Sequence, residues 1–91
     1  MKVEQSGIFK RRIKKLHHDE KLTLDEAVKT IMDNPSLGKV KTGDLAGIQV
    51  YKYKHNAQQY LLAYQFVADE ELLTLLALGT HENFYRDLKR P

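Results

Sequence analysis

The spacing of the apolar residues changes near the middle of the chain, and this change constrains the fold more than any other feature of the sequence. Phe9, Ile13 and Leu16 recur at i, i+4 and i+7, which is the period of a helix with one buried stripe. From Ile48 to Lys54 the residues alternate, which is the period of a strand with one buried face. Helices followed by strands indicate the α+β class.

Two helices are expected before the proline at position 35. Ser6 is a suitable N-cap for the first helix. The spacing of Thr23 and Glu26 is that of a capping box, which predicts that the second helix begins there, after a polar connection over residues 17–21. Asn34 precedes Pro35 and ends this helix. Two short amphipathic helices joined in this way predict an antiparallel hairpin.

The rest of the chain predicts a small sheet. Residues 35–47, with three glycines, are expected to form a loop. Three strands follow with short turns between them, so they should pair as an antiparallel meander, and the first residues add an edge strand. The apolar spacing after Thr80 predicts a short C-terminal helix. The expected architecture is an N-terminal helical hairpin packed on a small, mainly antiparallel sheet, with strands at residues 1–4, 48–54, 60–67 and 72–78.

Length and composition indicate one compact domain over residues 1–91. The hydrophobic fraction of 42% argues against intrinsic disorder. The chain has no cysteine, and the adjacent His17 and His18 lack a third ligand, so we expect no metal site and no small-molecule cofactor. The longest apolar segment, residues 72–79, is too short to cross a bilayer, and the N-terminus has no apolar stretch of signal-peptide length. We therefore expect a cytoplasmic protein without a membrane partner.

The charge is unevenly distributed. Residues 1–54 contain twelve Lys and Arg against seven Asp and Glu, a balance of +5, whereas residues 55–91 contain three against five, a balance of −2. A basic half favours contact with a polyanion. Many ordinary domains share such a charge, so it does not by itself identify a nucleic-acid partner. The basic residues 10–15 are open to two interpretations, a contact with RNA or a solvated helix face.

Three stretches together resemble the RelE/ParE superfamily of toxins from type II toxin–antitoxin systems. Residues 44–54 (DLAGIQVYKYK) are similar to the start of the family's second strand, and residues 61–64 (LLAY) to its third. Residues 75–85 (LLALGTHENFY) resemble the last strand and the tail of the YafQ-like branch, in which a G-T-H motif is followed four residues later by an aromatic residue. The resemblance covers essentially the whole chain. It implies a cognate antitoxin protein as partner.

Within this superfamily, RelE-like members cleave mRNA, mostly on the ribosome, and ParE-like members inhibit DNA gyrase. Metal-free RNA cleavage needs a base for the 2′-OH, cations for the crowded phosphorane, and an acid for the leaving oxygen. His81 is the first candidate, because imidazole exchanges protons near its ordinary pKa of about 6.5 and the residue follows Gly79 and Thr80 after the last strand. The alternative is that His81 caps or packs the last helix.

Other candidates are expected to bind the RNA. Lys52 and Lys54 lie two residues apart on a strand, so both side chains leave one face and suit a scissile phosphate; alternatively they are solvated edge lysines that discourage aggregation. Tyr85 follows His81 by one helical turn and suits base stacking; alternatively, either Tyr85 or Phe84 packs the tail against the sheet. His55 is a secondary candidate for an acid or base. The weaker candidates for RNA contact are Arg86, Lys39, Lys41 and Asn83.

The sequence thus predicts a metal-independent endoribonuclease toxin that cleaves mRNA, in association with the ribosome. His81, Lys52, Lys54 and Tyr85 form its expected catalytic set. The alternative is a gyrase inhibitor of the ParE type without nuclease activity, although the G-T-H-E-N-F-Y tail differs from the arginine-rich tails usual there. A decayed toxin retained as a binding module is a third possibility.

Overall fold

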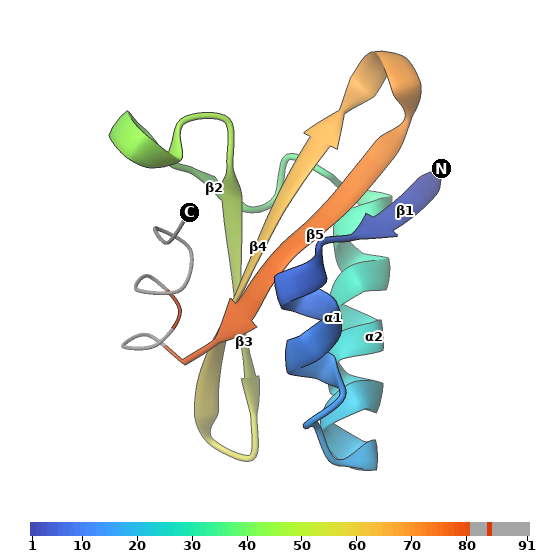
Figure 1. Ribbon diagram of the computed structural model, residues 1–91, viewed down its shortest axis with the longest axis vertical. Helices are drawn as coiled ribbons and strands as arrows, with labels where there is room; N and C mark the ends of the chain where they lie inside the picture. Colours follow the sequence, from blue (N-terminus) through green and yellow to red (C-terminus); the bar gives the residue numbers. More distant parts are fainter. Residues whose placement is uncertain (81–83, 85–91) are drawn as a thin grey trace.

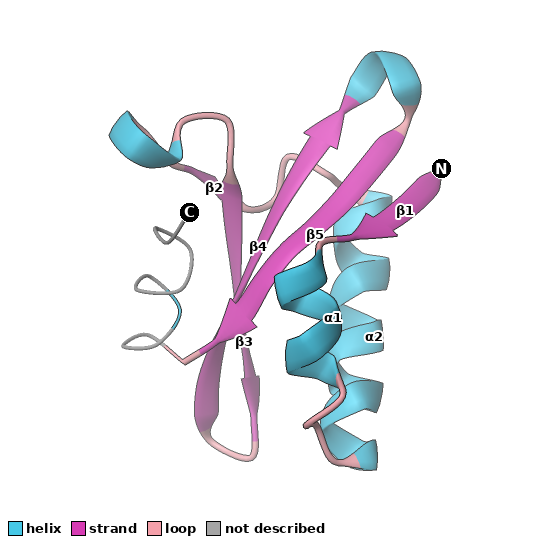
Figure 2. Cartoon of the chain, viewed as in Figure 1, coloured by secondary structure: helices cyan, strands magenta, loops and turns pink. Residues whose placement is uncertain are grey.

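A computed structural model of the chain describes residues 1–80 and Phe84. Two helices lie along one face of a five-stranded sheet whose strand order is β1-β5-β4-β3-β2 (Figures 1 and 2). The predicted α+β class and the mainly antiparallel sheet are confirmed. The elements are β1 (Lys2–Gln5), α1 (Gly7–Ile13), α2 (His18–Asp33), β2 (Lys39–Val40), β3 (Gln49–His55), β4 (Gln58–Val67) and β5 (Leu72–Gly79), with 3-10 turns η1 (Gly43–Leu45) and η2 (Ala68–Glu70).

Helix α1 begins as its sequence predicts. The Ser6 hydroxyl accepts a hydrogen bond from the Phe9 amide at 3.1 Å, so the N-cap prediction is confirmed. The same hydroxyl donates to the carbonyl of Leu76 at 2.7 Å, which fixes the start of the helix on strand β5. The helix ends at Ile13, and Leu16 reaches the core from the connection that follows.

Helix α2 begins earlier than predicted. Its N-cap position is His17, whose amide donates to the carboxylate of Glu20 at 3.0 Å. The predicted capping box at Thr23 is therefore wrong, because Thr23 already lies one turn inside the helix and its hydroxyl donates to the Asp19 carbonyl at 3.2 Å. The expected polar connection over residues 17–21 mostly belongs to this helix. The predicted end is confirmed, since the helix stops at Asp33, just before the Asn-Pro pair.

The antiparallel meander of β3, β4 and β5 is confirmed. A two-residue turn at Asn56 and Ala57 joins β3 to β4, and both residues have positive φ (49° and 67°), as in type I′ hairpins. Strand β1 extends the sheet on one side by pairing in parallel with β5. On the other side β2 pairs with β3, so the loop predicted over residues 35–47 contains a short edge strand that the sequence analysis missed.

A register shift divides β5 between two cores. Ala63 on β4 pairs with Ala77, but the next residue, Tyr64, pairs with Leu75, so Leu76 is an extra residue in β5. The shift allows Leu75 and Leu78 both to join the core under the helices, while Ala77 joins a smaller cluster on the opposite face. Burial of this strand on both faces, as its continuous apolar sequence predicts, is confirmed. Neither described helix has the length and apolar character needed to span a membrane.

Candidate functional site

Three lysines lie on the face of the sheet opposite the helices, which we call the lysine face. Residues that pair directly across strands point to the same face. Val50 pairs with Lys39 on β2 and with Ala63 on β4, and it belongs to the smaller core cluster, away from the helices. Lys52 and Lys54 share the face of Val50 because side chains alternate along β3. Lys39, Lys52 and Lys54 are all exposed. The predicted alternation is confirmed, and phosphate contact by these lysines remains a prediction.

A row of paired residues connects Lys52 with the end of β5. Lys52 pairs with Leu61, and Leu61 pairs with Gly79. Neighbouring strands are about 4.8 Å apart, so this row brings the backbone of Gly79 to within roughly 10 Å of the backbone of Lys52. Gly79 and Thr80 are the first two residues of the G-T-H motif. In this row, Leu61 therefore lies between Lys52 and Gly79, the last residue of β5.

Phe84 packs on the lysine face of the sheet. Its side chain is 1% exposed and packs with Val50, Leu61, Ala63 and Ala77. Its amide donates to the carbonyl of Thr80 at 2.9 Å, an i to i−4 bond. Phe84 thus faces inward. The predicted C-terminal helix and the candidates His81, Asn83, Tyr85 and Arg86 otherwise lie outside the described residues.

The lysine face is hollowed beside the lysine pair. A cavity of about 290 Å³ opens there, between the end of the β3–β4 hairpin and the middle of both strands. None of the described residues that line it is acidic. Its walls are formed by Lys52, Gln58, Gln59 and Leu61.

Lys39 is held in place by a buried tyrosine. The Tyr64 hydroxyl accepts from the Gly38 amide at 2.8 Å and donates to the Pro35 carbonyl at 2.7 Å. The side-chain amide of Gln49 donates to the same Pro35 carbonyl at 3.0 Å. These bonds fasten the segment between α2 and β2 to the helix face of the sheet, so that Lys39, the next residue, emerges on the other face. The amide of Lys41 donates to the Ile48 carbonyl at 2.9 Å, which extends the pairing beyond β2.

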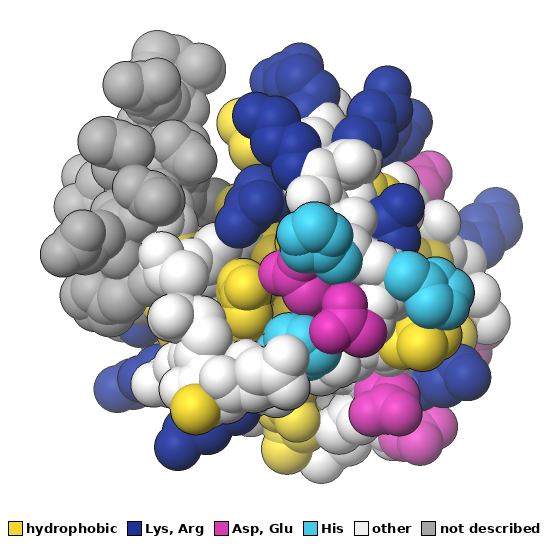
Figure 3. All heavy atoms as spheres, turned by 90° about the horizontal axis from the view of Figure 1, so that it is seen from below, with side chains coloured by type: hydrophobic (Ala, Val, Ile, Leu, Met, Phe, Trp, Pro, Cys, Tyr) yellow, Lys and Arg dark blue, Asp and Glu magenta, His cyan; other side chains and the backbone are white. Residues whose placement is uncertain are grey.

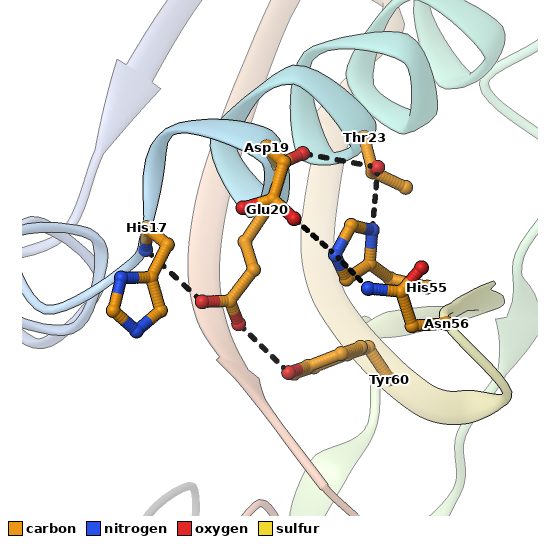
Figure 4. A network of polar contacts seen from close by, with 7 residues as sticks. All are labelled: His17, Asp19, Glu20, Thr23, His55, Asn56 and Tyr60. Carbon is orange, nitrogen blue, oxygen red and sulfur yellow. Dashed lines mark hydrogen bonds and ion pairs between the residues drawn. The ribbon is translucent and has the colours of Figure 1, made fainter.

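His55 lies on the opposite side of the sheet from the lysine pair, because side chains alternate along β3. Figure 4 shows its ring beside Asp19 and Thr23 of α2. Its ring is 14% exposed and packs against the N-terminal part of α2. Nδ1 lies 2.8 Å from the Thr23 hydroxyl, and Nε2 lies 3.4 Å from the Asp19 carboxylate and 3.3 Å from the Asn56 amide nitrogen. The structure therefore does not bring His55 together with Lys52 and Lys54. Its role as a second acid or base at an RNA phosphate has no support from this arrangement.

A second polar interaction joins α2 to the sheet, this time to β4. The Tyr60 hydroxyl donates to the Glu20 carboxylate at 2.9 Å. The His17 amide, and then the Tyr60 hydroxyl, hold the pKa of Glu20 below its ordinary value of 4.5. Burial, and then the bond to Glu20, raise the pKa of Tyr60. Histidine and acidic side chains gather at this end of the molecule (Figure 3). The sequence analysis missed this cluster, which the three-residue spacing of His17 and Glu20 could have indicated.

The basic residues of the first helix form a separate surface. Arg11, Arg12, Lys14 and Lys15 line a shallow hollow of about 380 Å³ at the end of α1. Because α1 covers the helix face, this hollow is not continuous with the lysine face. Both interpretations, RNA contact and solvation, remain predictions. Among residues 1–80 and Phe84, no group of three or more His, Asp or Glu is arranged to hold a metal ion.

Comparison with known proteins identifies the family. A model of the ParE-like toxins of type II bacterial toxin–antitoxin systems matches residues 3–89. The chain belongs to this family. No curated protein sequence matches the chain. The match covers nearly the whole sequence, so the expected RelE/ParE superfamily membership is confirmed.

Solved structures agree with this ParE-like assignment at the level of the fold. A chain of the intact E. coli RelBE toxin–antitoxin complex superposes with a TM-score of 0.71 at 17% identity, covering 89% of this chain and 96% of the other. The isolated E. coli RelE toxin gives 0.69 at 17% identity, with 89% and 84% covered. An arginine-to-alanine double variant of E. coli RelE bound to a RelB antitoxin peptide gives 0.70 at 15% identity, with 89% and 83% covered. At these identities the likeness concerns the fold of the ParE-like toxin and not its activity.

Proposed function

We propose that this ParE-like toxin is a metal-independent endoribonuclease that cleaves mRNA in association with the ribosome, and that the lysine face binds the scissile phosphate. The observation that supports this most directly is the row formed by Lys52, Leu61 and Gly79. It brings two exposed cations close to the residues that immediately precede His81. A phosphodiester needs such a combination of fixed positive charge and a group able to transfer protons.

The proposed reaction uses the RNA's own nucleophile. A base removes the proton from a 2′-OH, whose oxygen attacks the adjacent phosphorus. The bond from phosphorus to the 5′ oxygen breaks, and an acid protonates that oxygen, which leaves a 2′,3′-cyclic phosphate and a 5′-OH. His81 exchanges one of these protons, while Lys52 and Lys54 stabilise the additional negative charge on the phosphorane. Tyr85 stacks on a neighbouring base, and Lys39 contacts a flanking phosphate.

The cognate partner is an antitoxin protein. Membership in a type II toxin–antitoxin family supports this partner. A toxin of this kind would arrest its own cell without such a partner. We infer that the antitoxin covers the lysine face or displaces the C-terminal segment from it. The ribosome and mRNA are the proposed targets of the free toxin.

The test is to express the toxin without its antitoxin and map new mRNA 5′ ends, for the wild type and three variants. His81→Ala should lower the cleavage rate roughly 10²- to 10⁴-fold, because it removes a general acid or base. Lys52→Gln should lower it roughly 10²- to 10³-fold, because it removes a fixed charge at the phosphorane. Lys29→Gln is the matched control: this exposed lysine lies on α2, on the other side of the sheet, and its substitution should leave cleavage unchanged.

Circular dichroism spectra of the purified variants check that each remains folded. Cleavage by a folded His81→Ala variant at the wild-type rate would contradict the proposed mechanism. Equal losses in Lys52→Gln and Lys29→Gln would indicate that overall charge, and not the lysine face, is responsible.

The second candidate is inhibition of DNA gyrase without nuclease activity, which the ParE-like family description favours. Supercoiling of relaxed plasmid by purified gyrase distinguishes the two. Inhibition of supercoiling in the presence of the toxin, together with intact mRNA in expressing cells, would support gyrase as the target. Uninhibited supercoiling with cleaved mRNA would support the endoribonuclease.

A further inference from the structure

The cavity beside the lysine pair differs chemically from a simple phosphate site. Lys52 supplies a cation, but the other walls are an almost fully buried leucine and the two glutamines at the start of β4. Its volume of about 290 Å³ is at the lower end of the range for small-ligand pockets, which suits one planar ring better than a longer segment. A phosphate would accept hydrogen bonds from the side-chain amides but would gain nothing from the apolar wall.

A nucleobase matches these walls. Its flat face is apolar and suits the apolar wall that Leu61 contributes to the cavity. Its edge presents hydrogen-bond donors and acceptors side by side, and a glutamine amide presents one donor and one acceptor at the same spacing. In the part of the lining that the structure describes there is no carboxylate, so these walls leave the base's own phosphate free to approach Lys52.

The two glutamines are not equivalent. The side-chain amide of Gln58 donates to the Gln59 carbonyl at 3.2 Å and is thus occupied within the hairpin. The side-chain amide of Gln59 has no hydrogen-bond partner in the described part of the chain, and the residue is exposed. Gln59 pairs with Lys54 across the two strands, so both side chains rise from the lysine face with Cβ atoms about 5 Å apart.

We propose that this cavity binds one base of the RNA next to the scissile phosphate, and that Gln59 determines which base is accepted. The proposal rests on the function proposed above, since it concerns the same face. Lys52 and Lys54 hold the sugar–phosphate chain, which every sequence shares, whereas Gln59 contacts the base edge. The phosphate contacts fix the position of the RNA along the lysine face, and the side-chain amide of Gln59 discriminates between the bases that can occupy the cavity.

The first measurement compares cleavage sites in an RNA library with randomised positions. The wild type should show a base preference at one position beside the cut. Gln59→Ala should reduce that preference roughly 5- to 100-fold, because one bidentate contact is lost. Gln59→Glu should shift it toward the bases that present amino groups (adenine, cytosine and guanine) and away from uracil, because a carboxylate accepts from amino groups and repels carbonyl oxygens. Ratios between bases are unaffected by any general loss of RNA affinity.

Gln65→Ala is the matched control. Gln65 is an exposed glutamine on the same strand and the same face, six residues or about 20 Å further along. Its substitution should leave the base preference unchanged. A wild-type preference retained in Gln59→Ala, or an equal change in both variants, would overturn the proposal.

A second measurement separates this proposal from the nuclease proposal. Tetranucleotides of each base with 2′-O-methyl sugars lack the attacking hydroxyl, so their binding to the full-length toxin is independent of cleavage. Base-dependent affinity that Gln59→Ala abolishes, without any cleavage of ordinary RNA, would support the base site and overturn the nuclease. Cleavage with base-independent affinity would overturn the base site alone. A change in affinity for the antitoxin, with no change in base preference, would assign the cavity to the protein partner instead.

Discussion

Substituting Gly38 by alanine tests the contact that holds the α2–β2 segment to the sheet. A Cβ atom at position 38 would lie 2.6 Å from the hydroxyl oxygen of Tyr64 and 2.7 Å from its Cε1. Contacts this short require one partner to move. Tyr64 is 0% exposed, so its ring has no solvent to move into. The tyrosine hydroxyl would have to leave the Gly38 amide and the Pro35 carbonyl, to which it is bonded at 2.8 and 2.7 Å.

Two costs determine the expected loss of stability. Overpacking a well-filled interior costs about 1–3 kcal/mol. Leaving a buried backbone group such as the Gly38 amide without its partner costs about another 1–3 kcal/mol. We therefore expect Gly38→Ala to lower the free energy of unfolding by about 2–6 kcal/mol, a large share of the roughly 5–14 kcal/mol available to a chain of this length.

Urea denaturation followed by circular dichroism measures this loss. With a slope of about 1.5 kcal/mol per molar urea, a loss of 3 kcal/mol lowers the midpoint by about 2 M. Gly7→Ala is the matched control, because a Cβ there meets nothing closer than 3.8 Å and the residue begins α1; this variant should gain up to about 1 kcal/mol. In Tyr64→Phe the nearest clashing atom is removed, so adding Gly38→Ala should cost at least about 1 kcal/mol less than in the wild type. Equal midpoints for Gly38→Ala and the wild type would refute the reasoning.

Two further predictions concern the opposite end of the sheet. The His17 amide, and then the Tyr60 hydroxyl, lower the pKa of Glu20, so its carboxylate stabilises the fold above pH 4.5 and this contribution disappears as the pH falls through the lowered value. The melting temperature of the wild type should therefore exceed that of Glu20→Gln at about pH 7, and the difference should shrink below pH 4.5. An equal difference at about pH 3 would contradict this prediction. Ala57→Gly should raise the free energy of unfolding by about 0.5–1 kcal/mol in urea titrations, because φ is 67° at Ala57 and glycine adopts this conformation without strain. Ala63→Gly, in the middle of β4, is the control and should lower the free energy of unfolding. A loss of stability in Ala57→Gly would show that the alanine is not strained.

The fold was largely predictable because hydrophobic period is a strong local signal. The alternation from Ile48 to Lys54 correctly assigned opposite faces to Lys52 and Tyr53, and Ser6 correctly marked the start of a helix. The start of α2 was mispredicted for a specific reason. Histidine is not among the usual N-cap residues, so the Thr23 box seemed the better signal, although Glu20 was already placed to accept from the His17 amide.

Strand β2 was missed because two residues are too few to show a period. Lys39 and Val40 are both exposed, and they become a strand only by pairing with Val50 and Gln49. The extra residue at Leu76 was equally hidden, since a continuous apolar run looks the same in either register. Both features depend on contacts between distant segments, which local sequence patterns do not encode.

The candidate site was predictable where it depends on alternation along a single strand. Within one strand, sequence spacing assigned Lys52 and Lys54 to a common face. The same alternation separates His55 from these lysines: it directly follows Lys54 on β3, so its side chain lies on the other face, where Asp19 and Thr23 hold it. Proximity in sequence is therefore a poor guide to a shared site within a strand, because adjacent residues always face apart.

The alternation along β3 determines which histidine can reach a phosphate on the lysine face. An imidazole can serve a phosphate held by Lys52 only from the lysine face. His55 is excluded by its direction and by its contacts with α2. The Leu61–Gly79 pairing, in contrast, ends β5 beside the lysine pair, two residues before His81. If RNA cleavage persists in His81→Ala and is lost in His55→Ala, the substrate cannot lie on the lysine face, and the helix side of the sheet must contain the reactive groups.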